Sequence, residues 1–405
     1  MHSARLSVKG RIGGHVEVPG SKSESNRLLV LQALFPDIGI ENISTSDDTV
    51  VLQKALEKPS GLIDIGHAGT AMRFLTAYFA ATSGDPIVLT GSQRMKQRPI
   101  GILVDALREL GAMIDYVEND GFPPVRFHRN GLNGNSVKIG SNVSSQFITA
   151  LMLIAPALPE GLQIEILGQT VSRPYLQMTA SILRLAGIDA RQMDNFIRSP
   201  AVSRVSASIT VESDWSSASY FYSIVALSPI GTRISLSSFG PDSLQGDRAV
   251  SRIYERFGVT TEFESGKIIL TKKSDFLLKR LEMDFADYPD LTQTVAATCL
   301  GLSIPFAFTG LKTLRIKETD RILALANELN RLGGNASIVG DVLHFTPGNL
   351  KAGTLVQTYG DHRMALAFSA IAVRMPIVIE DFGVVSKSFP GYGSELQKLG
   401  FELSH

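Results

Sequence analysis

Basic, hydroxyl and amide side chains gather in short polar stretches that lead into apolar segments of this 405-residue chain. Gly20-Ser-Lys-Ser23, followed by Arg27, offers two hydroxyls, an ammonium and a guanidinium, and Ser144-Ser-Gln146 offers two hydroxyls and an amide. Four further cations stand in the second half of the chain: Lys317, Arg321, Arg363 and Lys387. Because such cations form charge-assisted hydrogen bonds with carboxylates and phosphates, this pattern predicts a site for small, multiply negative substrates.

The elements that follow these polar stretches strengthen the same prediction. The first turn of a helix leaves backbone N–H groups unpaired and carries a partial positive charge. Several helix starts directed at one cleft would therefore attract an anion before any side chain contributes. Gly66-His-Ala-Gly-Thr-Ala-Met-Arg73 adds a glycine-rich turn, which would let the backbone approach a phosphate closely.

Each motif taken alone also has a plain structural explanation. A Gly-Ser-Lys-Ser turn can be an ordinary helix N-cap, Asp290 can cap a helix that begins at Leu291, and His362 can be a core histidine. Lys317 and Arg321 can be a solvated helix start, where like charges four residues apart repel by roughly a few tenths of a kcal/mol. The repetition of similar tips along the chain favours the anion-binding explanation.

A repeated unit is expected to position these tips. A polar stretch followed by a short, almost wholly apolar segment occurs six times, at Ser23–Leu34, Gly69–Phe79, Ser144–Ile154, Ser216–Ala226, Asp290–Leu300 and Asp361–Ile371. A helix that is apolar on all sides is a buried helix. Six such helices predict two domains, each with three buried helices inside.

A second kind of helix accompanies several copies. It has one apolar face and ends before a glycine, the usual helix stop, as at Arg98–Leu110, Asp247–Phe257 and Asp320–Leu332. Two short strands then follow, such as Ala112–Val117 and Val125–His128. The predicted unit is βαβαββ, and the predicted fold class is α/β, with three units in each domain, buried helices inside and sheets outside (an inside-out α/β barrel).

The composition excludes several classes of protein. Lys and Arg total 39 and balance 39 Asp and Glu, whereas a nucleic-acid-binding domain normally carries a basic surplus. The longest apolar stretches run about a dozen residues, short of the roughly 20 that span a bilayer, and Met1–Gly14 has no apolar core of a signal peptide. The single cysteine, Cys299, permits no disulfide within the chain. We therefore expect a cytoplasmic protein without a membrane segment or a nucleic-acid partner.

Seven motifs resemble, in order, those of the 5-enolpyruvylshikimate-3-phosphate (EPSP) synthase family. They are Pro19–Arg27, Ala68–Arg73, Arg94–Ile100, Ser144–Phe147, Arg315–Arg321, Asp361–Met364 and Lys387–Pro390, so the resemblance covers nearly the whole chain. In that family the first strand belongs to the C-terminal domain and the chain crosses twice between domains. The resemblance therefore implies an N-terminal domain of residues 21–212, a C-terminal domain of residues 1–20 and 213–405, and an active site in the cleft between them.

The resemblance also implies a reaction. The enolpyruvyl group of phosphoenolpyruvate would pass to the 5-hydroxyl of shikimate 3-phosphate with release of phosphate, and no metal or organic cofactor is expected. A monomer is expected, with these two small molecules as its partners. Residues that match the family's shikimate 3-phosphate site are Lys22, Ser23, Arg27, Ser144, Ser145, Gln146, Ser172, Asp290 and Lys317. Those that match its phosphoenolpyruvate site are Lys22, Gly69, Arg98, Gln146, Arg321, Arg363 and Lys387.

This chemistry needs a base for the attacking hydroxyl and an acid for the vinyl carbon. By motif matching, Asp290 is expected to be the base and Glu318 the acid, with Lys387 assisting. Positioned proton transfer typically contributes about 10²–10⁴-fold. Which carboxyl handles which proton in each half-reaction stays open.

Four positions depart from the family pattern: His67, Thr313 and Gly360 replace a usual asparagine, and Phe74 replaces a usual proline. We expect none of them to touch the charged residues, so that they tune the site without abolishing it.

Three alternatives remain. An enolpyruvyl transferase acting on UDP-N-acetylglucosamine would share the fold and the donor, but it usually carries a reactive cysteine in its N-terminal domain, whereas Cys299 lies far along the chain. A non-catalytic phosphate-binding protein on the same scaffold would not need both Asp290 and Glu318. A nucleic-acid end-processing enzyme of similar repeat architecture is disfavoured by the balanced charge.

Overall fold

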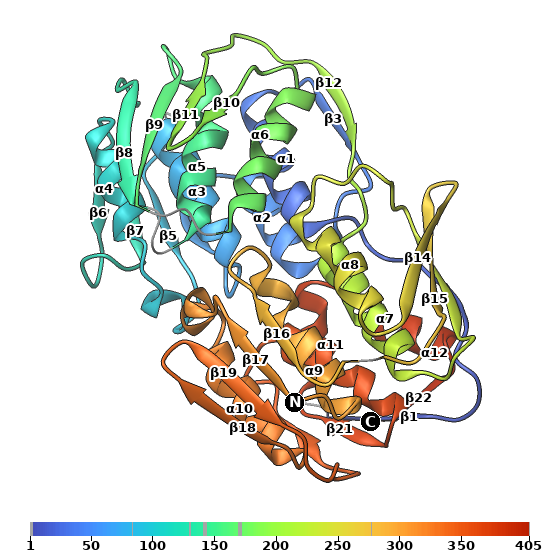
Figure 1. Ribbon diagram of the computed structural model, residues 1–405. Helices are drawn as coiled ribbons and strands as arrows, with labels where there is room; N and C mark the ends of the chain where they lie inside the picture. Colours follow the sequence, from blue (N-terminus) through green and yellow to red (C-terminus); the bar gives the residue numbers. More distant parts are fainter. Residues whose placement is uncertain are drawn as a thin grey trace. The chain divides into compact units, whose positions relative to one another are not determined.

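The computed structural model describes residues 3–82, 84–128, 131–140, 144–168, 172–276 and 278–404. The chain divides into two compact units (Figure 1). The central unit is Ser21–Val211, and the terminal unit combines Met1–Gly20 with Glu212–His405. Both units are mixed α/β, which confirms the predicted fold class.

Three helices of the central unit are buried over most of their length: α1 (Lys22–Leu34), α3 (Gly69–Ala81) and α5 (Ser145–Ile154). They contact one another, and α3 and α5 are buried on all sides. Three outer helices bury one face only: α2 (Asp47–Glu57), α4 (Gly101–Glu109) and α6 (Arg173–Leu185). The predicted division into inner and outer helices therefore holds in this unit.

Two four-stranded sheets of the central unit share one pattern. One has the strand order β4-β5-β7-β6 and the other the order β10-β11-β9-β8. In each sheet the first two strands in sequence are parallel and the next two form an antiparallel hairpin. Their bounds are β4 (Gly61–Asp64), β5 (Ile87–Thr90), β6 (Ile114–Tyr116), β7 (Val125–Phe127), β8 (Ser136–Gly140), β9 (Leu162–Leu167), β10 (Arg191–Met193) and β11 (Phe196–Ser199).

The repeat that contains α1 and α2 is shorter than the βαβαββ unit predicted for it. Its sheet has two parallel strands, β3 (Ile38–Glu41) and β12 (Ala207–Thr210), and no hairpin. The first strand, β12, comes from the far end of the unit because the chain enters at Ser21 directly into α1. After α2 ends at Glu57 the chain passes within a few residues into β4, which leaves no room for a hairpin.

The terminal unit repeats the arrangement of inner and outer helices. Its inner helices, which contact one another, are α7 (Trp215–Leu227), α9 (Thr292–Gly301) and α11 (His362–Ser369). Its outer helices are α8 (Val250–Glu255), α10 (Arg321–Arg331) and α12 (Tyr392–Lys398). On α10, Ile322, Leu325 and Leu329 are buried while Leu323 is half exposed, as expected for an amphipathic helix on a core.

Three four-stranded sheets complete this unit, with the orders β14-β15-β13-β2, β16-β17-β19-β18 and β20-β21-β1-β22. The two N-terminal strands, β1 (Ala4–Val8) and β2 (Gly14–Val16), join sheets made by the last part of the chain. The other strands are β13 (Arg233–Ser237), β14 (Val259–Glu264), β15 (Lys267–Lys272), β16 (Leu281–Asp284), β17 (Phe306–Thr309), β18 (Asn335–Val339), β19 (Val342–Thr346), β20 (Leu355–Val356), β21 (Ile377–Ile379) and β22 (Phe401–Ser404).

The second boundary lies one residue earlier than expected. Glu212, which the sequence analysis placed in the N-terminal domain, belongs to the terminal unit. Its carboxylate accepts hydrogen bonds from Trp215 Nε1 at 3.0 Å and from the backbone N–H of Gly240 at 3.1 Å. Ser213 forms an antiparallel bridge with Gly20, and these contacts attach the segment to the terminal unit.

In two predicted outer helices the α-helical part begins later than expected. Arg98 is extended (φ −94°, ψ 125°), and α4 starts at Gly101. The cause is Pro99, because the residue before a proline is kept out of the helical conformation. The helix predicted from Asp247 is divided into a 3-10 helix, η3 (Gly246–Ala249), and the short α8.

No helix within the described ranges combines the length and the apolar character that a membrane crossing requires.

Gly333, which follows α10, is expected to tolerate substitution less well than Gly353. Both have positive φ angles (+102° and +71°), so alanine costs roughly 1 kcal/mol or more of stability at either position. At Gly333 a Cβ would also lie 1.9 Å from the carbonyl oxygen of Asn349, whereas at Gly353 nothing lies within 4 Å. Urea unfolding should therefore show a clearly larger loss of stability for Gly333→Ala, and equal losses would contradict this account.

Candidate functional site

A buried guanidinium forms the centre of a charged cluster in the terminal unit. Arg321, the first residue of α10, has a side chain only 2% exposed and contacts three carboxylates. Its Nε lies 2.6 Å from Asp361 Oδ2, its Nη1 lies 3.0 Å from Asp290 Oδ1, and its Nη2 lies 2.8 Å from Glu318 Oε2. Burial alone would lower the pKa of the Arg321 guanidinium, but the three carboxylates outweigh burial and raise it.

Each predicted acid or base is held by a second cation as well. Arg363 Nη2 lies 2.9 Å from Asp290 Oδ2, and Lys387 Nζ lies 3.1 Å from Glu318 Oε1. Arg363 Nη1 also donates to the Tyr220 hydroxyl at 3.2 Å. Three cations, Arg321, Arg363 and Lys387, thus pair with three carboxylates, so the cluster is electrically balanced.

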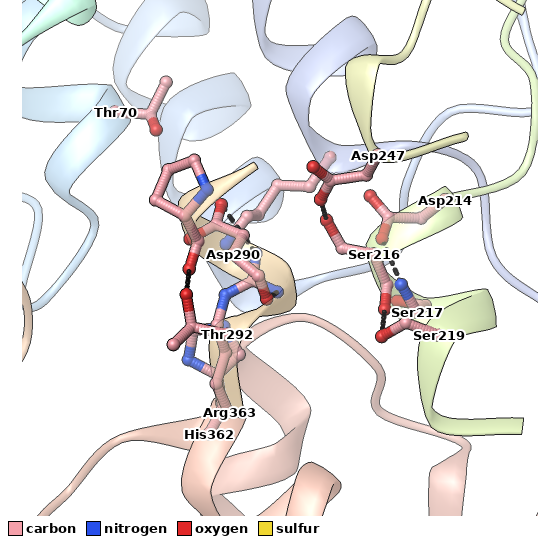
Figure 2. Close-up of polar contacts among 12 residues, drawn as sticks. Thr70, Asp214, Ser216, Ser217, Ser219, Asp247, Asp290, Thr292, His362 and Arg363 are labelled. Carbon is pink, nitrogen blue, oxygen red and sulfur yellow. Dashed lines mark hydrogen bonds and ion pairs between the residues drawn. The ribbon is translucent and has the colours of Figure 1, made fainter. Parts of the chain in front are cut away.

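Local backbone structure presents these groups. Asp290 lies in the 3-10 helix η4 (Pro289–Leu291) that precedes α9 (Figure 2), and Lys387 ends the 3-10 helix η7 (Phe382–Lys387). Asp361 is the N-cap of α11, where it accepts the backbone N–H of Arg363 at 2.9 Å. The tips of separate repeats thereby meet around Arg321.

The structure corrects two of the plain explanations weighed above. Asp290 does not cap the helix that follows it, since its carboxylate binds Arg321 and Arg363. Lys317 is not on one helix with Arg321, because it is the C-cap residue that follows the 3-10 helix η5 (Lys312–Ile316), and Asp320 caps α10. Arg321 is therefore no solvated helix start, and repulsion along a helix does not arise. His362 is buried, as the core-histidine alternative requires.

In the central unit, Lys22 opens α1 and its Nζ lies 3.1 Å from Asp48 Oδ2. Asp48 is buried in the first turn of α2, and the motif matching did not single it out. A carboxylate that forms an ion pair with a lysine 26 residues away has no signature of its own in the sequence. Ser23 follows Lys22, and its carbonyl oxygen accepts a hydrogen bond from Arg27 at 2.8 Å.

Arg27 is buried among aromatic and hydroxyl groups. Its Nε donates to Thr179 Oγ1 at 2.8 Å, and its guanidinium carbon lies 5.6 Å from the ring centroid of Phe74 and 6.0 Å from that of Tyr175. Burial lowers the pKa of Arg27 to about 10. The expectation that Phe74 touches no charged residue is therefore wrong, because its ring provides a cation–π contact for Arg27.

Gly69 and Arg98 lie against each other. Gly69 opens α3, and a Cβ added there would lie 2.5 Å from Arg98 Nη1. Arg73, one turn along α3, donates to the Gly69 and Pro99 carbonyl oxygens, both at 3.2 Å. The glycine is thus required for a close approach of the guanidinium to the start of the helix, and Arg73 holds the two segments together.

The remaining candidates also lie at helix starts. Ser144 caps α5 by accepting the backbone N–H of Gln146 at 3.2 Å, and Ser145 is the first residue of that helix. The Gln146 side chain donates to Thr70 Oγ1 at 3.2 Å, which connects the tips of α5 and α3. Ser172 is the N-cap residue of α6, has a left-handed backbone (φ 55°) and is buried.

Comparisons with known proteins identify the family of this chain. The family model for EPSP synthase (3-phosphoshikimate 1-carboxyvinyltransferase) matches residues 35–396. A protein of Bacteroides fragilis strain YCH46 named 3-phosphoshikimate 1-carboxyvinyltransferase is 46% identical over 404 residues, covering 98% of both chains. The chain belongs to the EPSP synthase family.

Other members of the EPSP synthase family match over a similar length. A 3-phosphoshikimate 1-carboxyvinyltransferase of Sulfurovum sp. strain NBC37-1 is 36% identical, covering 98% of this chain and 99% of its own. The structure of EPSP synthase from Acinetobacter baumannii is 21% identical with a TM-score of 0.78, covering all of both chains. The resemblance drawn from the seven motifs is thereby confirmed.

One titratable group near the cluster was missed by motif matching. Asp247, in η3, is buried and accepts a short hydrogen bond from the Ser216 hydroxyl (Figure 2). Burial and the charge of Asp290 raise the pKa of Asp247 to about 7, although the Ser216 hydrogen bond opposes them. The sequence showed Asp247 only as the start of an outer helix.

Within the part of the chain that the structure describes, no three or more His, Cys, Asp or Glu side chains are grouped as a metal site would require.

Asp247 is expected to make stability depend on pH. Its folded-state pKa of about 7 exceeds its ordinary value of 3.8, so the folded protein binds this proton more tightly than the unfolded chain. Its favourable contribution is complete below the ordinary value and is lost as pH rises through 7. Asp247→Asn, which stays neutral, should gain stability relative to wild type between about pH 5 and pH 8.

Thermal unfolding across this pH range measures the effect. Asp105→Asn serves as the control, since this carboxyl lies on α4 with its side chain 73% exposed. A difference between Asp247→Asn and wild type that did not change with pH would refute the prediction.

Proposed function

We propose that this chain transfers the enolpyruvyl group of phosphoenolpyruvate to the 5-hydroxyl of shikimate 3-phosphate and releases inorganic phosphate. This is the EPSP synthase reaction of the shikimate pathway, which leads through chorismate to the aromatic amino acids. Family membership supports the reaction. The single observation that carries the catalytic assignment is the pairing of Asp290 and Glu318 through the buried guanidinium of Arg321.

The cations of the cluster are proposed to bind phosphoenolpyruvate. The cluster contributes Arg321, Arg363 and Lys387. The central unit is proposed to contribute two further cations, Lys22 and Arg98, together with the hydrogen-bond donors of Gly69 and Gln146. Guanidinium groups suit this substrate because they bind carboxylate and phosphate bidentately. Because Arg98 lies close to Gly69, its guanidinium and the first backbone N–H groups of α3 can bind the same anion.

Shikimate 3-phosphate is proposed to bind mainly to hydroxyl and basic groups of the central unit. The residues are Lys22, Ser23, Arg27, Ser144, Ser145, Gln146 and Ser172, joined by Asp290 and Lys317 of the terminal unit. Most of these positions lie at the starts of α1, α5 and α6, where backbone N–H groups favour anions.

Asp290 and Glu318 are proposed to move the protons. Asp290 accepts the proton of the 5-hydroxyl while the hydroxyl oxygen bonds to C2 of phosphoenolpyruvate. Glu318 donates a proton to C3, which becomes a methyl group. The bond between C2 and the phosphate oxygen then breaks, and the phosphate leaves with the proton that came from the hydroxyl. One methyl proton passes to one of the two carboxylates, which restores the double bond between C2 and C3. An anion that binds Arg321 and Lys387 would compete with the Glu318 carboxylate for these two cations.

The alternatives lose support from the structure. Cys299 is fully buried in α9, where burial raises the pKa of its thiol, so it lacks the reactive thiolate of an enolpyruvyl transferase that uses cysteine. A non-catalytic phosphate-binding protein would have no need for two carboxylates each held between two cations. We also propose that the chain acts as a monomer in the cytoplasm.

The reaction is tested by release of inorganic phosphate. The purified protein with phosphoenolpyruvate and shikimate 3-phosphate should release phosphate in proportion to EPSP formed, with no added metal. UDP-N-acetylglucosamine in place of shikimate 3-phosphate should give none. Release with the nucleotide sugar only would establish the alternative transferase, and release with neither acceptor would overturn the enzymatic assignment.

Removal of either proposed proton carrier should reduce turnover. Asp290→Asn and Glu318→Gln keep the shape of each side chain but cannot exchange the proton, so kcat should fall at least about a hundredfold. Calorimetric binding of shikimate 3-phosphate should survive in Glu318→Gln, which separates a catalytic defect from a folding defect. Near-normal turnover in either variant would exclude the role assigned to that residue.

A further inference from the structure

Glu328 is a fully buried carboxylate on α10 that contacts neither Asp290 nor Arg321. Its Oε1 accepts the Tyr359 hydroxyl at 2.7 Å and lies 3.3 Å from Arg331 Nε, and its Oε2 accepts the backbone N–H of Gln357 at 3.1 Å. Burial is the main reason that the pKa of Glu328 is raised, and the three donors oppose it. A buried charge needs such donors, because isolated burial of a carboxylate is strongly unfavourable.

The segment that Glu328 holds has a strained backbone. Tyr359 (φ +55°) and Gly360 (φ +67°) are consecutive residues in the left-handed region, which is unusual for a bulky side chain. Such a conformation persists only where the surroundings determine it. The Tyr359 hydroxyl bonded to Glu328 supplies that constraint, and the turn closes with the Asp361 N–H bonded to the Thr358 carbonyl oxygen at 2.9 Å.

This turn sets the position of Asp361, the N-cap of α11. Asp361 binds Arg321 through its carboxylate and precedes Arg363 by two residues. Arg321 and Glu328 are seven residues apart on α10, about two helical turns, and so lie on the same face. One helix therefore holds the segment 357–363 at two points, Arg321 to Asp361 and Glu328 to Tyr359 and Gln357.

We infer that Glu328 is a positioning residue, which through Tyr359 and the left-handed turn holds Asp361 and Arg363 in register with Arg321. The inference rests on the proposed function, in which Arg321 and Arg363 bind phosphoenolpyruvate. Glutamine at 328 would keep one acceptor oxygen but place an amide N–H₂ among three donors. The turn at Tyr359 would then be held less firmly to α10. The distance between the guanidinium groups of Arg321 and Arg363 would no longer be fixed.

Glu328→Gln is the direct test, with Glu395→Gln as the matched control. Glu395 is also a buried carboxylate on an outer helix, α12, and accepts a backbone N–H from a distant segment, that of Glu17 at 3.1 Å. We expect Glu328→Gln to raise the KM for phosphoenolpyruvate about tenfold or more while the KM for shikimate 3-phosphate stays within about threefold. Glu395→Gln should leave both KM values within about twofold of wild type at a comparable loss of thermal stability.

Hydrogen–deuterium exchange supplies a readout that does not depend on the reaction. Glu328→Gln should speed exchange of the amides in segment 357–366, and Glu395→Gln should not. If the wild-type protein releases no phosphate, the proposed function fails. The exchange measurement then still tests whether Glu328 holds the segment 357–363. If Glu328→Gln folds poorly, Tyr359→Phe removes one hydrogen bond only and should shift the same two readouts in the same direction. Unchanged exchange, or KM values that rise equally for both substrates, would overturn the inference.

Discussion

The terminal unit depends on one buried guanidinium. Arg321 is held by carboxylates from three places in the chain, Asp290, Glu318 and Asp361, and no pair of them is adjacent in sequence. Removing one partner from a buried ion pair leaves an uncompensated charge and costs about 3–5 kcal/mol. This constraint explains why the tips of separate repeats meet at one point and why Arg363 can face Asp290.

The cations of the central unit are stabilised by different kinds of partner. These cations do not share partners: Lys22 lies against Asp48, Arg27 against hydroxyl and ring groups, and Arg98 against Gly69. In the terminal unit, an arriving anion must compete with carboxylates, two of which are proposed proton carriers.

The repeat accounts for both arrangements. Each inner helix follows a strand and begins at a polar tip, so packing three inner helices together also gathers three tips. This pattern changes only in the repeats next to the two points where the chain passes from one unit to the other. Strands β1 and β2 complete sheets of the terminal unit, and the repeat that contains α1 keeps two strands and no hairpin.

Much of this protein could be predicted from its sequence because the information is local. The apolar segments specify buried helices, the glycines specify where outer helices end, and the seven motifs specify the family. Asp290 and Glu318 were predicted as a pair, but only the tertiary structure shows that Arg321 bridges them. The roles of Asp48 and Glu328 and the contact of Phe74 with Arg27 were likewise decided by folding. A buried charge is stable only when distant segments bring donors within about 3 Å of it, and no spacing along the chain records which distant segment does so.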